Sequence, residues 1–254
     1  MGPILFNIYI NDLPANVNNP GIDTYMFADD VGLRCSSNSI NEINNLINYS
    51  SEVLGDWCSA NKLCLNSNKT CDISFSFNSR NVNKNCLKFL GILLDTRLIW
   101  YDHVNYIGSK LSKGLFLLRR LREAVDTNAL LKVYYSHIHS LLSYGITIWG
   151  NSSHSLKLFT MQKKAIRIIC NAPWNSHCKP LFQKLNILTL PSIYISTILI
   201  FVHINNSKFP VNSNTHSYNT RNKNQLKILP CSDNTTQKNW RYSAVKLGVR
   251  LFFA

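Results

Sequence analysis

The strongest fold signal in the chain is the stretch TYMFADDVGLRC, residues 24–35. Its two ends, residues 24–27 and 31–35, are short β-favouring runs, and Ala28, Asp29 and Asp30 separate them. This spacing predicts a β-hairpin with two carboxylates at its tip. Acidic residues are common in turns, so the hairpin alone does not assign a function.

A helix and two further strands are predicted after this hairpin. Residues 39–42, SINE, form a capping-box pattern, and apolar residues at helical spacing continue from there to Ala60-Asn61. Strands are expected at residues 73–77 and 87–94, and Gly91 within the second indicates a bulge or a close backbone approach. The first hundred residues therefore predict a small sheet with one face covered by an amphipathic helix.

The pattern changes to helices after Trp100. Apolar side chains at helical spacing mark residues 104–121, a second helix from a Thr127 cap to Gly145, and a third helix over 158–169. Most Lys and Arg residues of these segments lie off the apolar stripes. This arrangement is typical of a helical core with charged side chains in solvent.

The apolar run at residues 187–204 is close to the minimum length of a membrane span. Pro191 and polar residues such as Ser192 and His203 interrupt it, so we expect a buried helix entered at Pro191 and no membrane span. Residues 205–239 are rich in Asn, Ser and Thr and hold few large apolar side chains. This composition predicts a loosely ordered tail.

The charge of the chain is strongly asymmetric. The 254 residues carry a formal net charge of +14, but residues 1–100 hold 7 Lys/Arg and 9 Asp/Glu, whereas residues 101–254 hold 20 and 4. Clustered cations release counterions when they meet phosphates, so the second part is expected to face a polyanion. The alternative is a basic surface that is merely solvated.

The eight cysteines form no C-x-x-C pair, so the usual zinc-binding and disulfide-framework patterns do not apply. We expect reduced, mostly buried thiols in an intracellular protein. Cys170, His177 and Cys178 could supply soft metal ligands, but their spacing fits no common metal site. Met1 is followed by Gly-Pro and by an early Asp12, so no secretory signal is expected.

Several motifs resemble those of one polymerase family. Residues 27–30, FADD, resemble the catalytic hairpin of reverse transcriptases, and residues 2–7 followed by 10–14 resemble the element before that hairpin in non-LTR (LINE-like, jockey-type) retrotransposon polymerases. The further matching segments are Trp57 with residues 61–66 and Lys69-Thr70, residues 87–92 with Asp95, Leu98 and His103, Tyr144-Gly145 with Trp149-Gly150, residues 162–167, and residues 216–224. These segments follow the family order along nearly the whole chain.

The resemblance implies an α+β fold in three parts. Residues 1–100 would form a truncated reverse-transcriptase palm, which is an antiparallel sheet with a packed helix. Residues 101–204 would form a mainly helical, thumb-like region. Residues 205–254 would be a polar, loosely ordered tail.

The resemblance also implies RNA-templated DNA synthesis, with an RNA template, a DNA primer and deoxynucleotides as partners, in the nucleus and away from membranes. Two Mg²⁺ ions, or Mn²⁺, would be held in part by Asp29 as a direct ligand and by Asp30. Lys69 would protonate the leaving pyrophosphate or hold the nucleotide, unless it is only a solvated lysine. Phe89, Leu90 and Gly91 would form the primer grip, although strand-core residues would read the same. The expected nucleic-acid-binding residues are Lys110, Lys113, Lys163, Lys164 and Arg167.

The sequence also departs from the family. In the family, another metal-binding Asp and the nucleotide-binding fingers lie upstream of the Gly2-Pro3 element, and an endonuclease accompanies the polymerase; no segment here matches them. We therefore expect no polymerase activity from this chain alone. The alternatives are a non-enzymatic, basic nucleic-acid-binding relic, or an unstable relic with an exposed sheet edge and no function.

Overall fold

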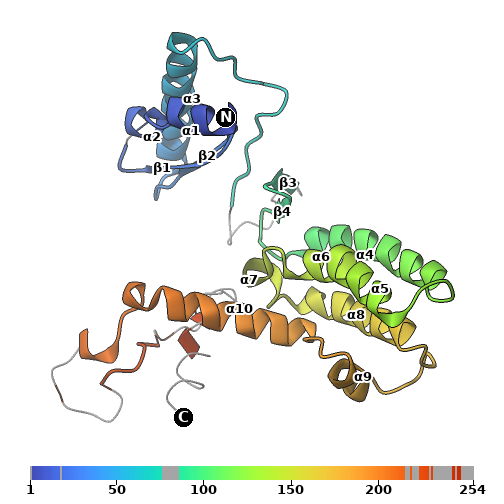
Figure 1. Cartoon of the computed structure of the whole chain (residues 1–254). Coiled ribbons are helices and arrows are strands. Elements are labelled where there is room, and N and C mark those ends of the chain that lie inside the picture. Colours follow the sequence, from blue (N-terminus) through green and yellow to red (C-terminus); the bar gives the residue numbers. More distant parts are fainter. Residues whose placement is uncertain are drawn as a thin grey trace. The chain divides into compact units, whose positions relative to one another are not determined.

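A computed structural model of the protein describes residues 2–17, 19–75, 86–214, 218, 223–228, 230, 242–243 and 245–246. The chain divides into two compact units, Met1–Cys71 and Asp72–Ala254, shown in Figure 1. Helices accompany two small antiparallel sheets, each of two strands, in agreement with the predicted α+β class. The division between units falls before residue 100, so the second hairpin belongs with the helices.

The first unit packs short helices and a hairpin against one long helix. Its elements are α1 (Gly2–Tyr9), α2 (Leu13–Asn16), β1 (Ile22–Phe27), β2 (Asp30–Cys35) and α3 (Ile40–Ala60). A core of buried side chains joins them: Ile10, Leu13, Val17, Ile22, Trp57 and Cys58. Two side-chain bonds add to it, because Tyr9 donates its hydroxyl to the Asn61 carbonyl and the Trp57 indole donates to the Asp12 carboxylate at 3.4 Å.

The predicted hairpin at residues 24–35 is confirmed and is slightly longer than expected. β1 and β2 pair antiparallel, with Phe27 opposite Asp30, so Ala28 and Asp29 alone make the turn and Asp30 is the first residue of β2. Ala28 has a φ of 53°, in the left-handed region that residues with a Cβ rarely adopt. The turn is therefore tight, and Asp29 is one of its two exposed residues.

Helix α3 begins where the sequence predicts, but the capping box does not form. Ser39 is the N-cap residue, yet its side chain makes no capping hydrogen bond. The Glu42 carboxylate instead accepts a hydrogen bond from the Ser37 hydroxyl, and Ser37 Oγ accepts one from the Ser39 amide at 3.3 Å. Ser37 thus takes the place that the pattern assigns to the Ser39 backbone.

The strand expected at residues 73–77 is not observed in its described part. Residues 73–75 have no strand structure, and Phe75 is exposed. β-propensity alone does not make a strand, because the backbone hydrogen bonds require a partner. Residues 76 and 77 lie outside the described residues.

The segment expected to be one strand at residues 87–94 is a hairpin. β3 (Cys86–Phe89) pairs antiparallel with β4 (Ile92–Asp95), and Leu90 and Gly91 form the turn. Both turn residues have positive φ, 46° and 81°, as a two-residue hairpin turn of this twist requires. The β-favouring run alone predicts a single strand, because it does not mark Leu90 and Gly91 as a turn.

The second unit continues as a group of helices. They are α4 (Tyr101–Leu121), α5 (Thr127–Tyr134), α6 (Ser140–Ser143), α7 (Ile146–Trp149), α8 (Leu156–Ile169), α9 (Cys178–Lys184) and α10 (Leu190–Ile204), with a π-helical turn at Tyr135–His139 and 3₁₀ turns at Ser153–Ser155, Asn206–Lys208 and Asn212–Asn214. The helices predicted at 104–121 and 158–169 are confirmed. In Figure 1, α4 and α5 lie beside α8, and α9 lies at the end of α8.

Two helix starts differ in detail from the sequence prediction. α5 is capped by Asp126, whose carboxylate accepts from the Ala129 amide at 2.9 Å, and Thr127 is the first helical residue. α10 is capped by Thr189, and Pro191 lies in its first turn as predicted. No helix in the described part of the chain is both long and apolar enough to cross a membrane.

Among the described residues, the polar tail and the cysteines fit the prediction only in part. Leu226, in the segment expected to be loosely ordered, is buried in the helical core, and Val211 pairs with it in an isolated β-bridge. The described cysteines are all free thiols, but Cys64, Cys71 and Cys86 are exposed. No group of three or more His, Cys, Asp or Glu side chains there could hold a metal ion, and this includes the region of Cys170 and Cys178.

Gln162 is a fully buried polar side chain in the core of the second unit, and it makes three hydrogen bonds. The Gln162 amide nitrogen donates to the Tyr134 hydroxyl and to the Leu188 carbonyl, both at 2.9 Å, and its oxygen accepts from the Leu190 amide at 2.8 Å. Gln162 has no exposed surface. It therefore joins α8 to α5 and to the start of α10. Burial of its partner Tyr134 raises the pKa of that hydroxyl to about 12.

We predict that Gln162→Leu lowers the free energy of unfolding of the helical unit by about 2–4 kcal/mol. The substitution leaves the Leu188 carbonyl and the Leu190 amide buried without their partner. Urea unfolding followed by far-UV circular dichroism measures the change. Gln183→Leu, at an exposed position of α9, is the control and should change stability by less than about 0.5 kcal/mol. Equal effects of the two substitutions would contradict the role of Gln162.

Candidate nucleic-acid interface

Two carboxylates project from the first hairpin. Asp29 lies in the turn, Asp30 begins β2, and both are exposed. Carboxylate oxygens are the hard ligands that Mg²⁺ prefers, so the chemistry of these two residues suits magnesium binding. Two carboxylates do not make a full ligand set, and the described residues bring no third acid or histidine to the same place. The neighbouring Asp23 is occupied by its cross-strand partner Arg34.

Lys69 lies in a turn between α3 and the end of the first unit. Its amide donates to the Asn66 carbonyl at 3.0 Å, and its side chain is exposed. Among the described residues it forms no ion pair with Asp29 or Asp30. Its proposed role at the leaving group therefore stays a prediction.

The second hairpin carries Phe89, Leu90 and Gly91 at its turn, and Tyr144 supports that turn. Tyr144 donates its hydroxyl to the Leu90 carbonyl at 2.5 Å. A Cβ placed on Gly91 would lie 3.6 Å from the Tyr144 ring, so the ring packs directly against the turn. Tyr144 is itself 54% exposed, so this contact lies at the surface of the unit.

His103 on α4 holds the other side of the same hairpin. Its Nδ1 accepts a hydrogen bond from the Leu93 amide of β4 at 3.2 Å. The ring is buried, and burial lowers the pKa of His103, with a smaller effect from Lys110. A neutral imidazole is required, because a protonated Nδ1 could not accept this bond.

Trp149 connects the two contacts on the hairpin. Its indole nitrogen donates to the Tyr144 carbonyl at 3.0 Å, and its ring meets His103 edge to face with centroids 5.8 Å apart. Gly145 lies between them with a φ of 59°, and a Cβ there would stand 2.8 Å from Ile92 Cδ1. The positive φ favours glycine at this position, and any other residue would also displace the end of the Ile92 side chain.

Next to the hairpin, Lys88 and Lys110 flank Tyr106. The Lys110 ammonium lies 4.4 Å from the Tyr106 ring centroid, and that of Lys88 lies 5.5 Å from it. Hydrogen bonding with Lys110, together with Lys88, lowers the pKa of Tyr106. Lys113 is exposed on α4, three residues beyond Lys110. These residues place positive charge beside the predicted primer grip.

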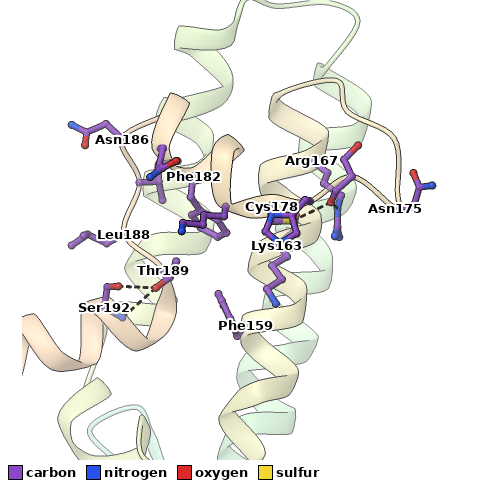
Figure 2. A pocket seen from close by; sticks show the side chains of 15 residues that line it. Phe159, Lys163, Arg167, Asn175, Cys178, Phe182, Asn186, Leu188, Thr189 and Ser192 are labelled. Atoms are coloured by element: carbon purple, nitrogen blue, oxygen red, sulfur yellow. Dashed lines mark hydrogen bonds between the residues drawn. The ribbon is translucent and has the colours of Figure 1, made fainter.

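A second group of cations lies on α8. Lys163 and Arg167 are one turn apart and line a pocket of about 600 Å³, shown in Figure 2. The Lys163 ammonium lies 4.2 Å from the Phe159 ring centroid, and Arg167 Nε donates to the Ser176 carbonyl at 3.0 Å. Lys164 is exposed and does not line the pocket.

The structure thus separates the predicted binding residues into groups. Lys110 and the primer-grip residues lie at or beside the β3–β4 hairpin, whereas Lys163 and Arg167 share a pocket on α8. The reasoning from sequence missed Lys88 and Tyr106. The four-residue interval between Tyr106 and Lys110 is the helical spacing that could have paired them.

The contrast in net charge is larger between the two structural units than between residues 1–100 and residues 101–254. Residues 1–71 hold 3 Lys/Arg and 7 Asp/Glu, and residues 72–254 hold 24 and 6. The formal charges are therefore −4 and +18. The hairpin with the two carboxylates belongs to the acidic unit, and both groups of cations belong to the basic one.

Part of the chain matches a known protein family. Residues 1–110 match the family model for reverse transcriptase (RNA-dependent DNA polymerase). That range includes the Asp29-Asp30 turn and the whole β3–β4 hairpin. No solved structure gives a significant match to the chain.

The most similar curated proteins include polymerases of insect transposons. The probable RNA-directed DNA polymerase from transposon X-element of Drosophila melanogaster is 27% identical over 217 residues, which cover 75% of this chain and 23% of that protein. The RNA-directed DNA polymerase from mobile element jockey of the same species is 23% identical, covering 74% and 23%. The chain spans about a quarter of the length of these relatives. The resemblance to non-LTR reverse transcriptases is confirmed.

We predict that Tyr144→Phe loosens the β3–β4 hairpin. Loss of the bond to the Leu90 carbonyl costs about 0.5–1.5 kcal/mol, which corresponds to roughly 2- to 12-fold faster amide exchange if the hairpin opens locally. Hydrogen–deuterium exchange of peptides covering residues 86–95 measures this rate.

Tyr135→Phe is the matched control for this prediction. Tyr135 is exposed to a similar degree, 45%, and belongs to the π-helical turn rather than to the hairpin contact. It should leave exchange at residues 86–95 unchanged. Equal acceleration by both substitutions would show that the Tyr144 hydroxyl does not support the turn.

Proposed function

We propose that this chain is part of an RNA-directed DNA polymerase of a non-LTR retrotransposon, which extends a DNA primer along an RNA template. The observation that supports it best is the reverse-transcriptase match over residues 1–110, with the Asp29-Asp30 pair at a hairpin turn. In this proposal the first unit is part of the palm. The helices from α4 onward form a thumb-like region.

Asp29 would be a direct metal ligand and Asp30 the second acid at the same tip. Bound Mg²⁺ or Mn²⁺ would stabilise negative charge on the attacking and leaving oxygens of nucleotidyl transfer. Exposure of both carboxylates supports this role, because neither is consumed by an ion pair among the described residues. Lys69 would act on the pyrophosphate or hold the deoxynucleotide.

The β3–β4 hairpin would position the primer end through the backbone and side chains of Phe89, Leu90 and Gly91. Its anchoring by Tyr144 and His103 supports this role, since a primer-positioning element must be held in place. The cations of α4 and α8 would then contact the template and primer phosphates: Lys110, Lys113, Lys163, Lys164 and Arg167.

A second function, nucleic-acid binding without catalysis, is favoured by the charge of +18 on residues 72–254. The two proposals share the basic surface and differ in whether the carboxylates act. Both place the protein in the nucleus, where such elements meet chromosomal DNA.

We predict that the isolated 254-residue chain extends no primer on an RNA template with Mg²⁺ or Mn²⁺. Two-metal catalysis needs carboxylates converging from several elements, and the described residues bring only Asp29 and Asp30 together. The measurement is primer extension on a gel, with a retroviral reverse transcriptase as positive control. Template-dependent extension that disappears in Asp29→Asn would show that this chain is itself a polymerase.

We predict that the chain binds an RNA–DNA hybrid with a steep salt dependence. Lys110→Gln with Lys113→Gln should reduce the slope of log K against log salt by about 1 to 2, since each phosphate contact contributes about 0.9. Fluorescence anisotropy titrations at salt concentrations between about 50 and 200 mM measure the binding constant and give the slope. Lys62→Gln, in the acidic unit, is the control and should leave the slope unchanged. An unchanged slope in the double variant would refute the contact.

A further inference from the structure

The pocket on α8 combines three features that a solvated helix face does not require. It is concave, it has an apolar floor, and cations stand at its wall. Its lining comes from α8, from the loop before α9, from α9 itself, and from the segment that begins α10 (Figure 2). All of these belong to the second unit, so the pocket is formed within one compact part of the chain.

The floor of the pocket is aromatic and aliphatic. Phe159 of α8 and Phe182 of α9 lie with ring centroids 6.3 Å apart, inclined by 38°. Phe182 is buried with 5% of its surface exposed, Phe159 is half-buried, and Leu188, which also lines the pocket, is 52% exposed. A flat apolar ligand placed here would remove the exposed part of this lining from water.

The charged side chains of the lining are Lys163, Arg167 and Lys179, and no carboxylate accompanies them. Lys163 holds its ammonium over Phe159, and Arg167 is fixed against the Ser176 carbonyl. The sequence has no Asp or Glu between Asp126 and Asp233, so α5 to α10 bring no acid to this pocket. Phosphate oxygens would thus meet Lys163 and Arg167 without competition from an internal ion pair.

We propose that this pocket binds one unpaired nucleotide of a single-stranded nucleic acid, with its base on the Phe159–Phe182–Leu188 floor and its phosphate at Lys163 and Arg167. The inference rests on the proposed nucleic-acid-binding function and adds a specific subsite to it. A volume of about 600 Å³ accommodates a single nucleotide, but a closed base pair would not bury its bases in it. Base stacking on aromatic side chains together with cationic contacts is the usual chemistry of single-strand binding.

Lys163 and Lys164 offer a matched pair for the test. They are consecutive on α8 and carry the same charge, but only Lys163 lines the pocket. A general electrostatic attraction would lose similar affinity from either substitution. A pocket for one nucleotide would make only the first substitution weaken single-strand binding more than duplex binding.

The experiment measures binding of the full chain to a fluorescein-labelled 12-nucleotide single-stranded RNA and to a blunt 12-base-pair duplex at fixed salt. Lys163→Gln is expected to weaken single-strand binding by about 5- to 10-fold, and duplex binding by a clearly smaller factor. Lys164→Gln removes one general phosphate contact, so it is expected to weaken single-strand and duplex binding by the same factor. Lys163→Arg should retain binding, and circular dichroism checks that each variant is folded.

A second variant tests the floor separately from the charge. Phe159→Leu keeps an apolar side chain in the pocket and removes the aromatic ring, so single-strand binding is expected to fall about 3- to 10-fold. Adenosine monophosphate should displace the labelled strand at concentrations where inorganic phosphate does not. Displacement by phosphate, or by an acidic peptide, as effective as that by the nucleotide would overturn the base-binding floor.

The possible failures are distinguishable. Equal losses for Lys163→Gln and Lys164→Gln would overturn the pocket and leave nucleic-acid binding by the basic unit intact. Equal losses on single strand and duplex for Lys163→Gln would do the same. Absence of binding to either nucleic acid by the unchanged chain would instead refute the proposed function on which the pocket depends.

Discussion

The buried amide of Gln162 is the constraint on which the helical unit depends. Burying a neutral polar side chain destabilises the fold unless its hydrogen-bond donors and acceptor all have partners. In Gln162 one N–H donates to the Tyr134 hydroxyl, the other donates to the Leu188 carbonyl, and the oxygen accepts from the Leu190 amide. These bonds fix the helical phase of α8. Since Lys163 follows Gln162 directly, the direction of Lys163 is set by the same bonds that place Leu188 at the pocket.

The β3–β4 hairpin shows a similar dependence on side chains far away in sequence. A two-stranded ribbon is marginally stable by itself, and this one has a non-glycine residue, Leu90, at positive φ in its turn. Tyr144 and His103 each bond to its backbone, and Trp149 joins those two residues. The hairpin is therefore a part of the helical unit, and it is the helices that determine where Phe89, Leu90 and Gly91 are presented.

The sequence was informative wherever a local pattern decides the structure. The β-favouring runs on both sides of Asp29 and Asp30 predict the acidic hairpin. The helical spacing of apolar residues predicts α4 and α8, and Pro191 predicts the start of α10. The capping box failed because Ser37, outside the motif, binds Glu42. The strand expected at 73–77 is not observed in its described part, residues 73–75, because β-propensity does not supply a partner strand. The bonds of Gln162 and Tyr144 span 26 to 54 residues, and no short pattern records contacts at that range.

The separation of charge explains how one chain can contain both an acidic tip and a strongly basic surface. Carboxylates that are to bind a divalent cation lose affinity for it when lysines or arginines pair with them, and phosphate-binding cations lose theirs when acids pair with them. Asp29 and Asp30 stand in a unit of charge −4, and the cations of α4 and α8 stand in a unit of charge +18. Asp23 shows what the separation avoids: its bond with Arg34 leaves that carboxylate satisfied within the protein. Keeping the two sets of charges on different units leaves each set available to a ligand of opposite sign.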